Sequence, residues 1–182
     1  MVLLIVFLAS VFVAVGTGVL SALSDVRGMR IPNLHSGIII GAFVVCYGLL
    51  WLGGRDDVFA PLGSHLLGGL VVFGVTLAMF MGGVFGGGDS KLASAFSVWL
   101  GLKGLIPFVF YMSVAGGLLA LAALALKKWK PVKNPKPESW IARVQAGESK
   151  VPYGVAIVMG ALVSFVEIGY FRGEVLSSFL AG

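Results

Sequence analysis

Long apolar runs recur along this chain and constrain its fold more than any other feature. Only 12% of the residues are charged, about half the share that is usual in a soluble domain. The charged residues cluster between the apolar runs, several of which reach about 20 residues, the length of a helix that crosses a bilayer core. The sequence therefore predicts an all-α, multi-pass membrane protein that forms one domain over residues 1–182.

Six transmembrane helices are expected. Their predicted ranges are about 2–23, 35–52, 64–83, 90–102, 104–126 and 153–171, with a basic loop over 127–150. The fourth range is the shortest, because a helix of that length rises only about 20 Å. The positive-inside rule favours counting it as a crossing.

With six crossings and both termini outside, in the periplasm, the cations divide unevenly between the two sides. The inner side receives Arg27, Arg30, Lys91, Lys127, Lys128, Lys130, Lys133, Lys136, Arg143 and Lys150, and the outer side receives Arg55, Lys103 and Arg172. If the fourth range did not cross, the cations of the 127–150 loop would lie outside. The bias therefore predicts polar loops on the cytoplasmic side of a bacterial inner membrane.

Two acidic residues stand at the predicted inner ends of helices. Asp25 follows the first apolar run, and Asp89 follows the glycines Gly86, Gly87 and Gly88 before the fourth. We expect these glycines to form a loop, and Asp89 to cap the helix that begins at residue 90. The six-helix topology brings both carboxylates to the same depth at the cytoplasmic face.

Two adjacent carboxylates can perform general acid–base chemistry without a metal. Both cannot ionise cheaply, so the pair holds a single proton. The ionised member then deprotonates a water that attacks a peptide carbonyl, and the protonated member donates to the carbonyl oxygen. Taken singly, each aspartate also fits a plain helix-end residue. The pairing favours an aspartic protease with no cofactor.

Other polar residues near the pair are open to two interpretations. Lys91 is either an aid to an ionised carboxylate or an inner-face anchor, and the same alternatives hold for Arg27 and Arg30. Pro32 punctuates the link after Asp25, and Asn33 is expected to cap the second helix. His35 and His65 fall on opposite sides of the membrane in this topology and cannot share a metal.

The basic loop over 127–150 carries Trp129 and Trp140 and is expected to lie against anionic lipid. Ser139 is expected to cap a short helix that runs through Gln145. The net charge of +5 is explained by membrane orientation, so nucleic acid is not expected as a partner.

These motifs together resemble the type IV prepilin peptidases, which are GxGD-type intramembrane aspartic proteases. The resemblance rests on Asp25 with Ile31-Pro32-Asn33, on Gly86 to Asp89 with Lys91, and on Pro152, Tyr153 and Gly154 opening the last helix. The last block is similar to the small tight-adherence (Tad/Cpa) branch.

The resemblance implies an enzyme that removes the short basic leader of type IV prepilins and pseudopilins at the cytoplasmic membrane face. It implies that Asp25 and Asp89 are catalytic and that the motif glycines let the substrate approach. The longer relatives also methylate the new N-terminus and carry a cysteine-rich insertion after the first helix. Here Cys46 is the single cysteine, so cleavage without N-methylation is expected.

Two alternatives from other classes stay open. The same carboxylates suit a small ion-coupled transporter, although such sites usually lie near the bilayer midplane between repeated halves. A non-catalytic assembly protein of a pilus or secretion machine would need neither carboxylate. Loss of function after Asp89→Asn separates that last class from an enzyme.

Overall fold

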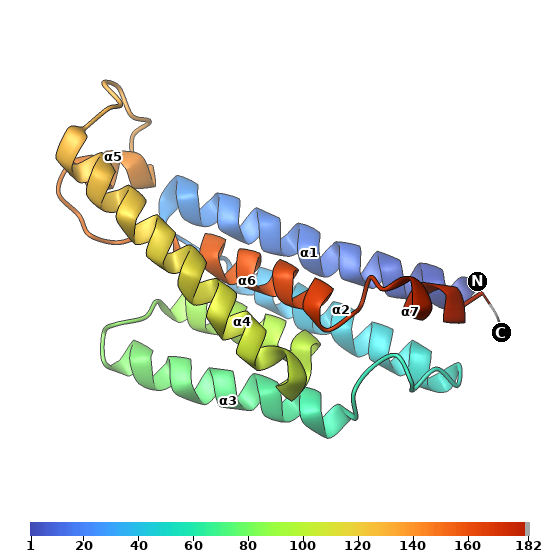
Figure 1. The fold of residues 1–182 in the computed structure, drawn as a ribbon. Coiled ribbons are helices and arrows are strands. Elements are labelled where there is room, and N and C mark those ends of the chain that lie inside the picture. The colour runs from blue at the N-terminus through green and yellow to red at the C-terminus, as the bar shows by residue number, and fades with distance from the viewer. Residues whose placement is uncertain (181–182) are drawn as a thin grey trace.

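All regular elements in the described part of the chain, residues 1–180 of this computed structural model, are helices. They are α1 (Val2–Gly28), α2 (Asn33–Leu52), α3 (Leu62–Met81), α4 (Gly87–Trp129), α5 (Trp140–Gln145), α6 (Tyr153–Glu167) and α7 (Gly173–Ser178) (Figure 1). The helices α1, α2, α3 and α4 are long and apolar enough to cross a membrane, and α6 is a shorter apolar helix. The all-helical, membrane-type fold is confirmed. That six segments cross a membrane stays a prediction.

The helix α4 contains a reversal at Gly101. Its backbone angles there are φ 58° and ψ −174°, which separate two helical segments within one element. Thr76 of α3 hydrogen-bonds Ser90 near the start of α4, whereas Ser64, at the other end of α3, accepts from the backbone N–H of Leu102. The first segment of α4 therefore runs antiparallel to α3. The reversal falls in the predicted fourth range, one residue before its end.

The second segment of α4 returns along α6. Gly104 lies against Ile168 just after α6, and Gly116 lies against Tyr153 at its start. The starts of α4 and α6 and the C-terminal end of α1 therefore share one end of the bundle, whereas the start of α1 and the helix α7 lie toward the opposite end (Figure 1). This arrangement brings Asp25 and Asp89 to the same end.

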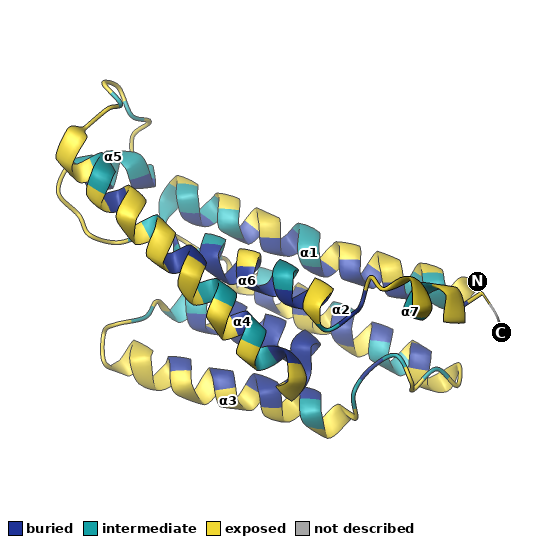
Figure 2. Ribbon diagram, in the orientation of Figure 1, coloured by how far each residue is buried: buried dark blue, intermediate teal, exposed yellow. Residues whose placement is uncertain are grey.

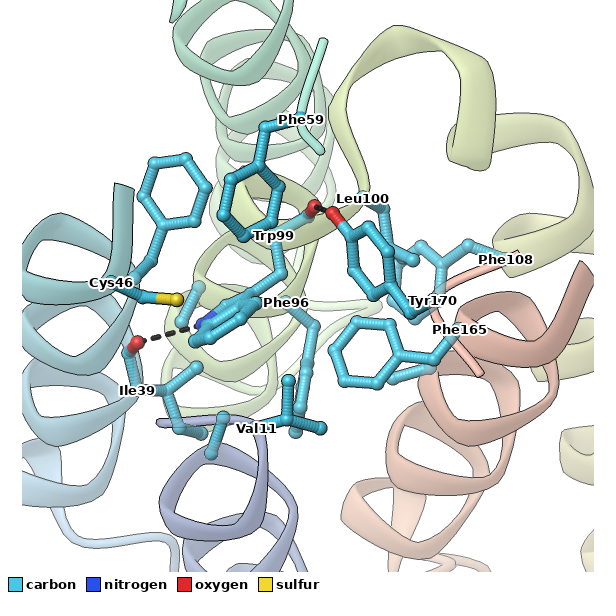
Figure 3. Packing of buried hydrophobic residues seen from close by; sticks show 14 of the residues in the cluster. Val11, Ile39, Cys46, Phe59, Phe96, Trp99, Leu100, Phe108, Phe165 and Tyr170 are labelled. Atoms are coloured by element: carbon cyan, nitrogen blue, oxygen red, sulfur yellow. Dashed lines mark hydrogen bonds between the residues drawn. The ribbon is translucent and has the colours of Figure 1, made fainter. Parts of the chain in front are cut away.

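Aromatic side chains fill the centre of the bundle. The Trp99 indole N–H donates to the carbonyl of Ile39 in α2, and the Tyr170 hydroxyl donates to the carbonyl of Trp99 (Figure 3). Both bonds satisfy polar groups that are costly to bury unpaired. Buried residues line the inward faces of the helices, and large apolar residues such as Phe12 and Ile106 cover the outward faces (Figure 2). Apolar outward faces are expected of helices that contact lipid.

Several predicted helix boundaries are wrong by two to five residues. The helix α1 continues through Asp25 to Gly28, so this carboxylate lies inside a helix. The helix α3 begins and ends two residues early, and α6 ends at Glu167, four residues before the predicted end. Beyond it, the short helix α7 occupies the C-terminal tail and is held by Arg55, which donates to Ser178.

The 127–150 loop folds against the end of the bundle that holds the aspartates. The predicted Ser139 cap is confirmed, because its hydroxyl accepts from the backbone N–H of Ala142 in α5. Trp140, however, is not a lipid-facing anchor: it is 9% exposed and packs in a small cluster with Ala123 and Val144, against which Met29 also lies. Trp129 remains 71% exposed.

Candidate functional site

Asp25 lies in the last turn of α1 and is held by the start of α6. Its side chain is 5% exposed, and its Oδ2 accepts a hydrogen bond of 2.8 Å from the backbone N–H of Gly154. A Cβ at Gly154 would stand 3.0 Å from the same oxygen. The absence of a side chain at Gly154 therefore permits the backbone to reach the carboxylate.

Asp89 lies in the first turn of α4, where the partial positive charge of the helix N-terminus favours a carboxylate. The prediction that Asp89 caps the helix is wrong, because Gly86 is the N-cap residue of α4 and no side chain makes a capping hydrogen bond there. Asp89 Oδ2 packs so closely against Gly86 that a Cβ there would collide with it. Asp89 Oδ1 is buried and has no hydrogen-bond partner within residues 1–180.

The two carboxyl groups lie close enough for their charges to interact, although they come from separate helices. No hydrogen bond joins them in the described part of the chain. The site thus holds one carboxylate oxygen with a backbone donor, Asp25 Oδ2, and one buried carboxylate oxygen without a donor, Asp89 Oδ1. A pair of nearby acids with different hydrogen-bonding environments suits general acid–base chemistry.

Each motif glycine is required for a different close approach. A Cβ would meet Asp89 at Gly86, the Phe80 ring at 3.2 Å at Gly87, and the Cβ of Ile31 at 3.1 Å at Gly88. The prediction of a glycine loop is therefore wrong for Gly87 and Gly88, which are the first residues of α4. These three glycines matter because neighbouring groups occupy the space that a side chain would need, since none of them has a positive φ.

Ile31 is part of a sequence motif but was not predicted as a site residue, and the structure places it in the site. Its side chain packs against Gly88 and would also stand 3.0 Å from a Cβ at Gly154. It therefore fills the space between the starts of α4 and α6, beside both acids. Its position directly before Pro32 was the available signal, but a single apolar residue in a link is uninformative without the fold.

The remaining predicted residues surround the pair at varying distance. Lys91 Nζ donates to Asn33 Oδ1 at 2.9 Å, so Asn33, the first residue of α2, bridges to α4 and does not cap its helix. Pro32 and Pro152 are the N-cap residues of α2 and α6. Arg27 and Arg30 are exposed.

Tyr153 joins the site from α6. Its ring packs edge-on against Phe85 with a centroid distance of 5.4 Å, and its hydroxyl lies within the electrostatic influence of Asp89. Phe85 was also missed, since it precedes the glycines without any distinguishing pattern. The two rings form an aromatic wall next to the carboxyl pair.

The two histidines lie toward opposite ends of the bundle. His35 Nδ1 hydrogen-bonds Ser21, one turn before Asp25, whereas His65 Nδ1 hydrogen-bonds the carbonyl of Val98 near the Gly101 reversal. They cannot share a metal. Among residues 1–180, no group of three or more potential metal-binding side chains is found.

Comparison with known protein families gives one match over residues 12–121. The matching model describes the type IV leader peptidase family, and its span includes both Asp25 and Asp89. Comparisons with curated proteins and with solved structures found no match.

Proposed function

The chain belongs to the type IV leader peptidase family, and we propose that it is an aspartic endopeptidase in which Asp25 and Asp89 form the catalytic pair. Family membership supports a protease that processes prepilin-type substrates in general. The aspartic mechanism and the identity of the two catalytic residues do not follow from family membership and are part of the proposal. They rest on one observation: two separate helices bring a carboxylate to the same end of the bundle, within electrostatic reach of each other.

The proposed roles follow from the hydrogen bonds of each acid. The Gly154 N–H stabilises negative charge on Asp25 Oδ2, so Asp25 is assigned as the base. Asp89, whose Oδ1 is buried and unpartnered, is assigned as the acid. Asp25 accepts a proton from water as the water oxygen bonds to the scissile carbonyl carbon. Asp89 donates to the carbonyl oxygen, which stabilises the tetrahedral intermediate.

Collapse of the intermediate completes the reaction. The carbon–nitrogen bond breaks, the proton held by Asp25 passes to the departing amine, and Asp89 recovers its proton from the oxygen. No oxidant, metal or covalent enzyme intermediate enters this sequence of steps.

The proposed orientation keeps six crossings and places the aspartates at the cytoplasmic face of a bacterial inner membrane. The return of α4 at Gly101 supports counting its two segments separately. The excess of cations on the predicted inner side supports the direction. In this orientation the 127–150 loop meets anionic lipid through exposed lysines and Trp129, while Trp140 holds the loop to the bundle.

The proposed substrate is a type IV prepilin or pseudopilin with a short basic leader, cleaved without N-methylation. Cys46 is the single cysteine, and only four residues separate α1 from α2. A cysteine-rich insertion like that of the methylating relatives has no counterpart there. We assign the chain to the small tight-adherence (Tad/Cpa) branch on this ground and on the Pro152 to Gly154 block.

A cleavage assay tests the proposal. Purified full-length protein in liposomes meets a prepilin with a basic leader, and mass spectrometry locates the cut and any methyl group. Asp25→Asn and Asp89→Asn keep the side-chain shape, and each is expected to lower the rate by about 10²–10⁴-fold, because general acid–base catalysis contributes that much.

Asp56→Asn is the matched control, because Asp56 is an exposed carboxylate in the link between α2 and α3. It is expected to cleave like the wild type. Unchanged cleavage by either Asp25→Asn or Asp89→Asn would refute the catalytic pair. A methylated product would refute the proposal that the enzyme cleaves without N-methylation, but it would not refute the protease activity.

A further inference from the structure

An open groove lies between the C-terminal end of α1 and the start of α2. It is on the face of α1 that points away from Asp25. It encloses about 490 Å³. The residues that matter for its chemistry are Leu20, Leu23, Ser24, Arg27, Arg30 and His35. None of its lining residues is acidic. The groove is therefore distinct from the carboxyl pair.

The α1 wall of the groove changes from apolar to cationic along one helix face. Leu20, Leu23, Ser24 and Arg27 follow the spacing that places side chains in one row. Leu20 and Leu23 are 57% and 44% exposed. Asp25 lies on the opposite, buried face. A molecule in this groove would meet an apolar wall on one side and a cation at the helix end.

Two guanidinium groups stand at the cationic end without partners. Neither Arg27 nor Arg30 makes a side-chain hydrogen bond or ion pair in the part of the chain that the structure describes. The Ser24 hydroxyl donates to the carbonyl of Arg30 at 2.7 Å, which fixes the link beside α1. Both cations are thus held near one another by backbone that is already anchored.

We propose that this groove binds the phosphate headgroup of an anionic phospholipid, with its acyl chains lying along Leu20 and Leu23. A guanidinium presents paired donors that match phosphate oxygens. Basic pockets between membrane helices are suited to such headgroups. The apolar wall favours a lipid over free phosphate, and the two cations would repel a basic leader peptide. The inference requires that α1 crosses a membrane, and it does not require protease activity.

Native mass spectrometry of the full-length protein tests the site by counting retained lipids. The probes are phosphatidylglycerol and the zwitterionic phosphatidylcholine. Arg27→Gln with Arg30→Gln is expected to lower phosphatidylglycerol affinity roughly thirtyfold, taking about fivefold for each arginine near a membrane surface. Phosphatidylcholine retention should not change.

Lys103→Gln with Arg172→Gln is the matched control, because it removes the same charge from two exposed positions outside both the groove and the 127–150 loop. This variant is expected to retain phosphatidylglycerol within about twofold of wild type. Equal losses of phosphatidylglycerol affinity in the two double variants would overturn the proposed site, because they would indicate a general attraction between the lipid and the positive charge of the protein. No loss in the arginine variant would also overturn it.

Two further arms separate the remaining explanations. Arg27→Lys with Arg30→Lys keeps the charges without the paired donors, so an intermediate affinity is expected even if the glutamine variant misfolds. Inorganic phosphate should not compete with phosphatidylglycerol. Full competition by phosphate, or displacement of the lipid by a prepilin peptide, would reassign the groove and overturn the proposal.

Discussion

The backbone N–H of Gly154 donates to Asp25 Oδ2 at 2.8 Å and so joins the last long helix of the chain to the first. The contact depends on the missing side chain, since a Cβ would stand 3.0 Å from both this oxygen and Ile31 Cδ1. The proposed catalytic base is therefore positioned by a residue far away in sequence.

Gly154→Ala is expected to lower cleavage on the order of a hundredfold, because a shift of about 1 Å in a reacting group has that effect. Gly41→Ala serves as its control, since a Cβ at Gly41 in α2 meets nothing within 4 Å. The measurement is the rate of leader removal beside the thermal unfolding of both variants. Normal cleavage by Gly154→Ala would remove the positioning role.

Gly86→Ala is expected to separate activity from folding. The added Cβ would meet the Asp89 carboxyl group, which can rotate away at little cost to the helix. Cleavage should therefore fall by about tenfold or more, while unfolding temperature changes little. An equal loss of stability and activity would indicate that Gly86 supports the fold instead.

The meeting of Asp25 and Asp89 at one end of the bundle could be predicted from sequence, because apolar runs and cation counts determine which helix ends coincide. The contacts that hold the two aspartates in place could not be predicted from sequence. Asn33 was expected to cap its own helix, yet its amide oxygen accepts from Lys91. Capping preferences are local, and a side chain from another helix outcompetes them once the fold brings it near.

Stability is expected to decrease in acid through the link between α2 and α3. Hydrogen bonds from Arg55, aided by its charge, hold the pKa of Asp57 below its usual value. The folded-state pKa is lower than the unfolded one, so the contribution is complete above the unfolded value, about 3.9. It is lost as pH falls through the folded value.

Asp57→Asn measures this contribution. The unfolding temperature of the variant should lie below that of wild type at neutral pH, and the two should converge in strong acid. The difference corresponds to at most about 1 kcal/mol, since the Asp57 side chain is 60% exposed to solvent. A difference that persists unchanged in acid would show that charge is not its source.

Trp140→Ala is expected to release the 127–150 loop. Trp140 packs against Ala123 and Val144, and its indole N–H donates to the carbonyl of Lys150. Without these contacts α5 should open locally, and trypsin should cut at Arg143 about tenfold faster or more. Trp129→Ala, at an exposed position, should digest like wild type.

The burial of Trp140 also illustrates where sequence reasoning stops. Tryptophan beside lysines in a membrane protein usually indicates the lipid interface, and Trp129 fits that pattern. Trp140 differs only because α5 turns back onto α4 and Met29. That packing depends on the folded loop and leaves no mark in the local composition.

The reversal at Gly101 makes α4 two antiparallel segments where a straight helix would be one. Its angles, φ 58° and ψ −174°, belong to a region that is essentially restricted to glycine. Continued as a straight rod, the 43 residues of α4 would extend about 65 Å, roughly twice a bilayer core. In the proposed six-crossing topology, every later segment would then change compartment, and Gly154 would face the opposite side from Asp25. Within that topology, one residue without a side chain decides whether Asp25 and Gly154 reach the same side of a membrane.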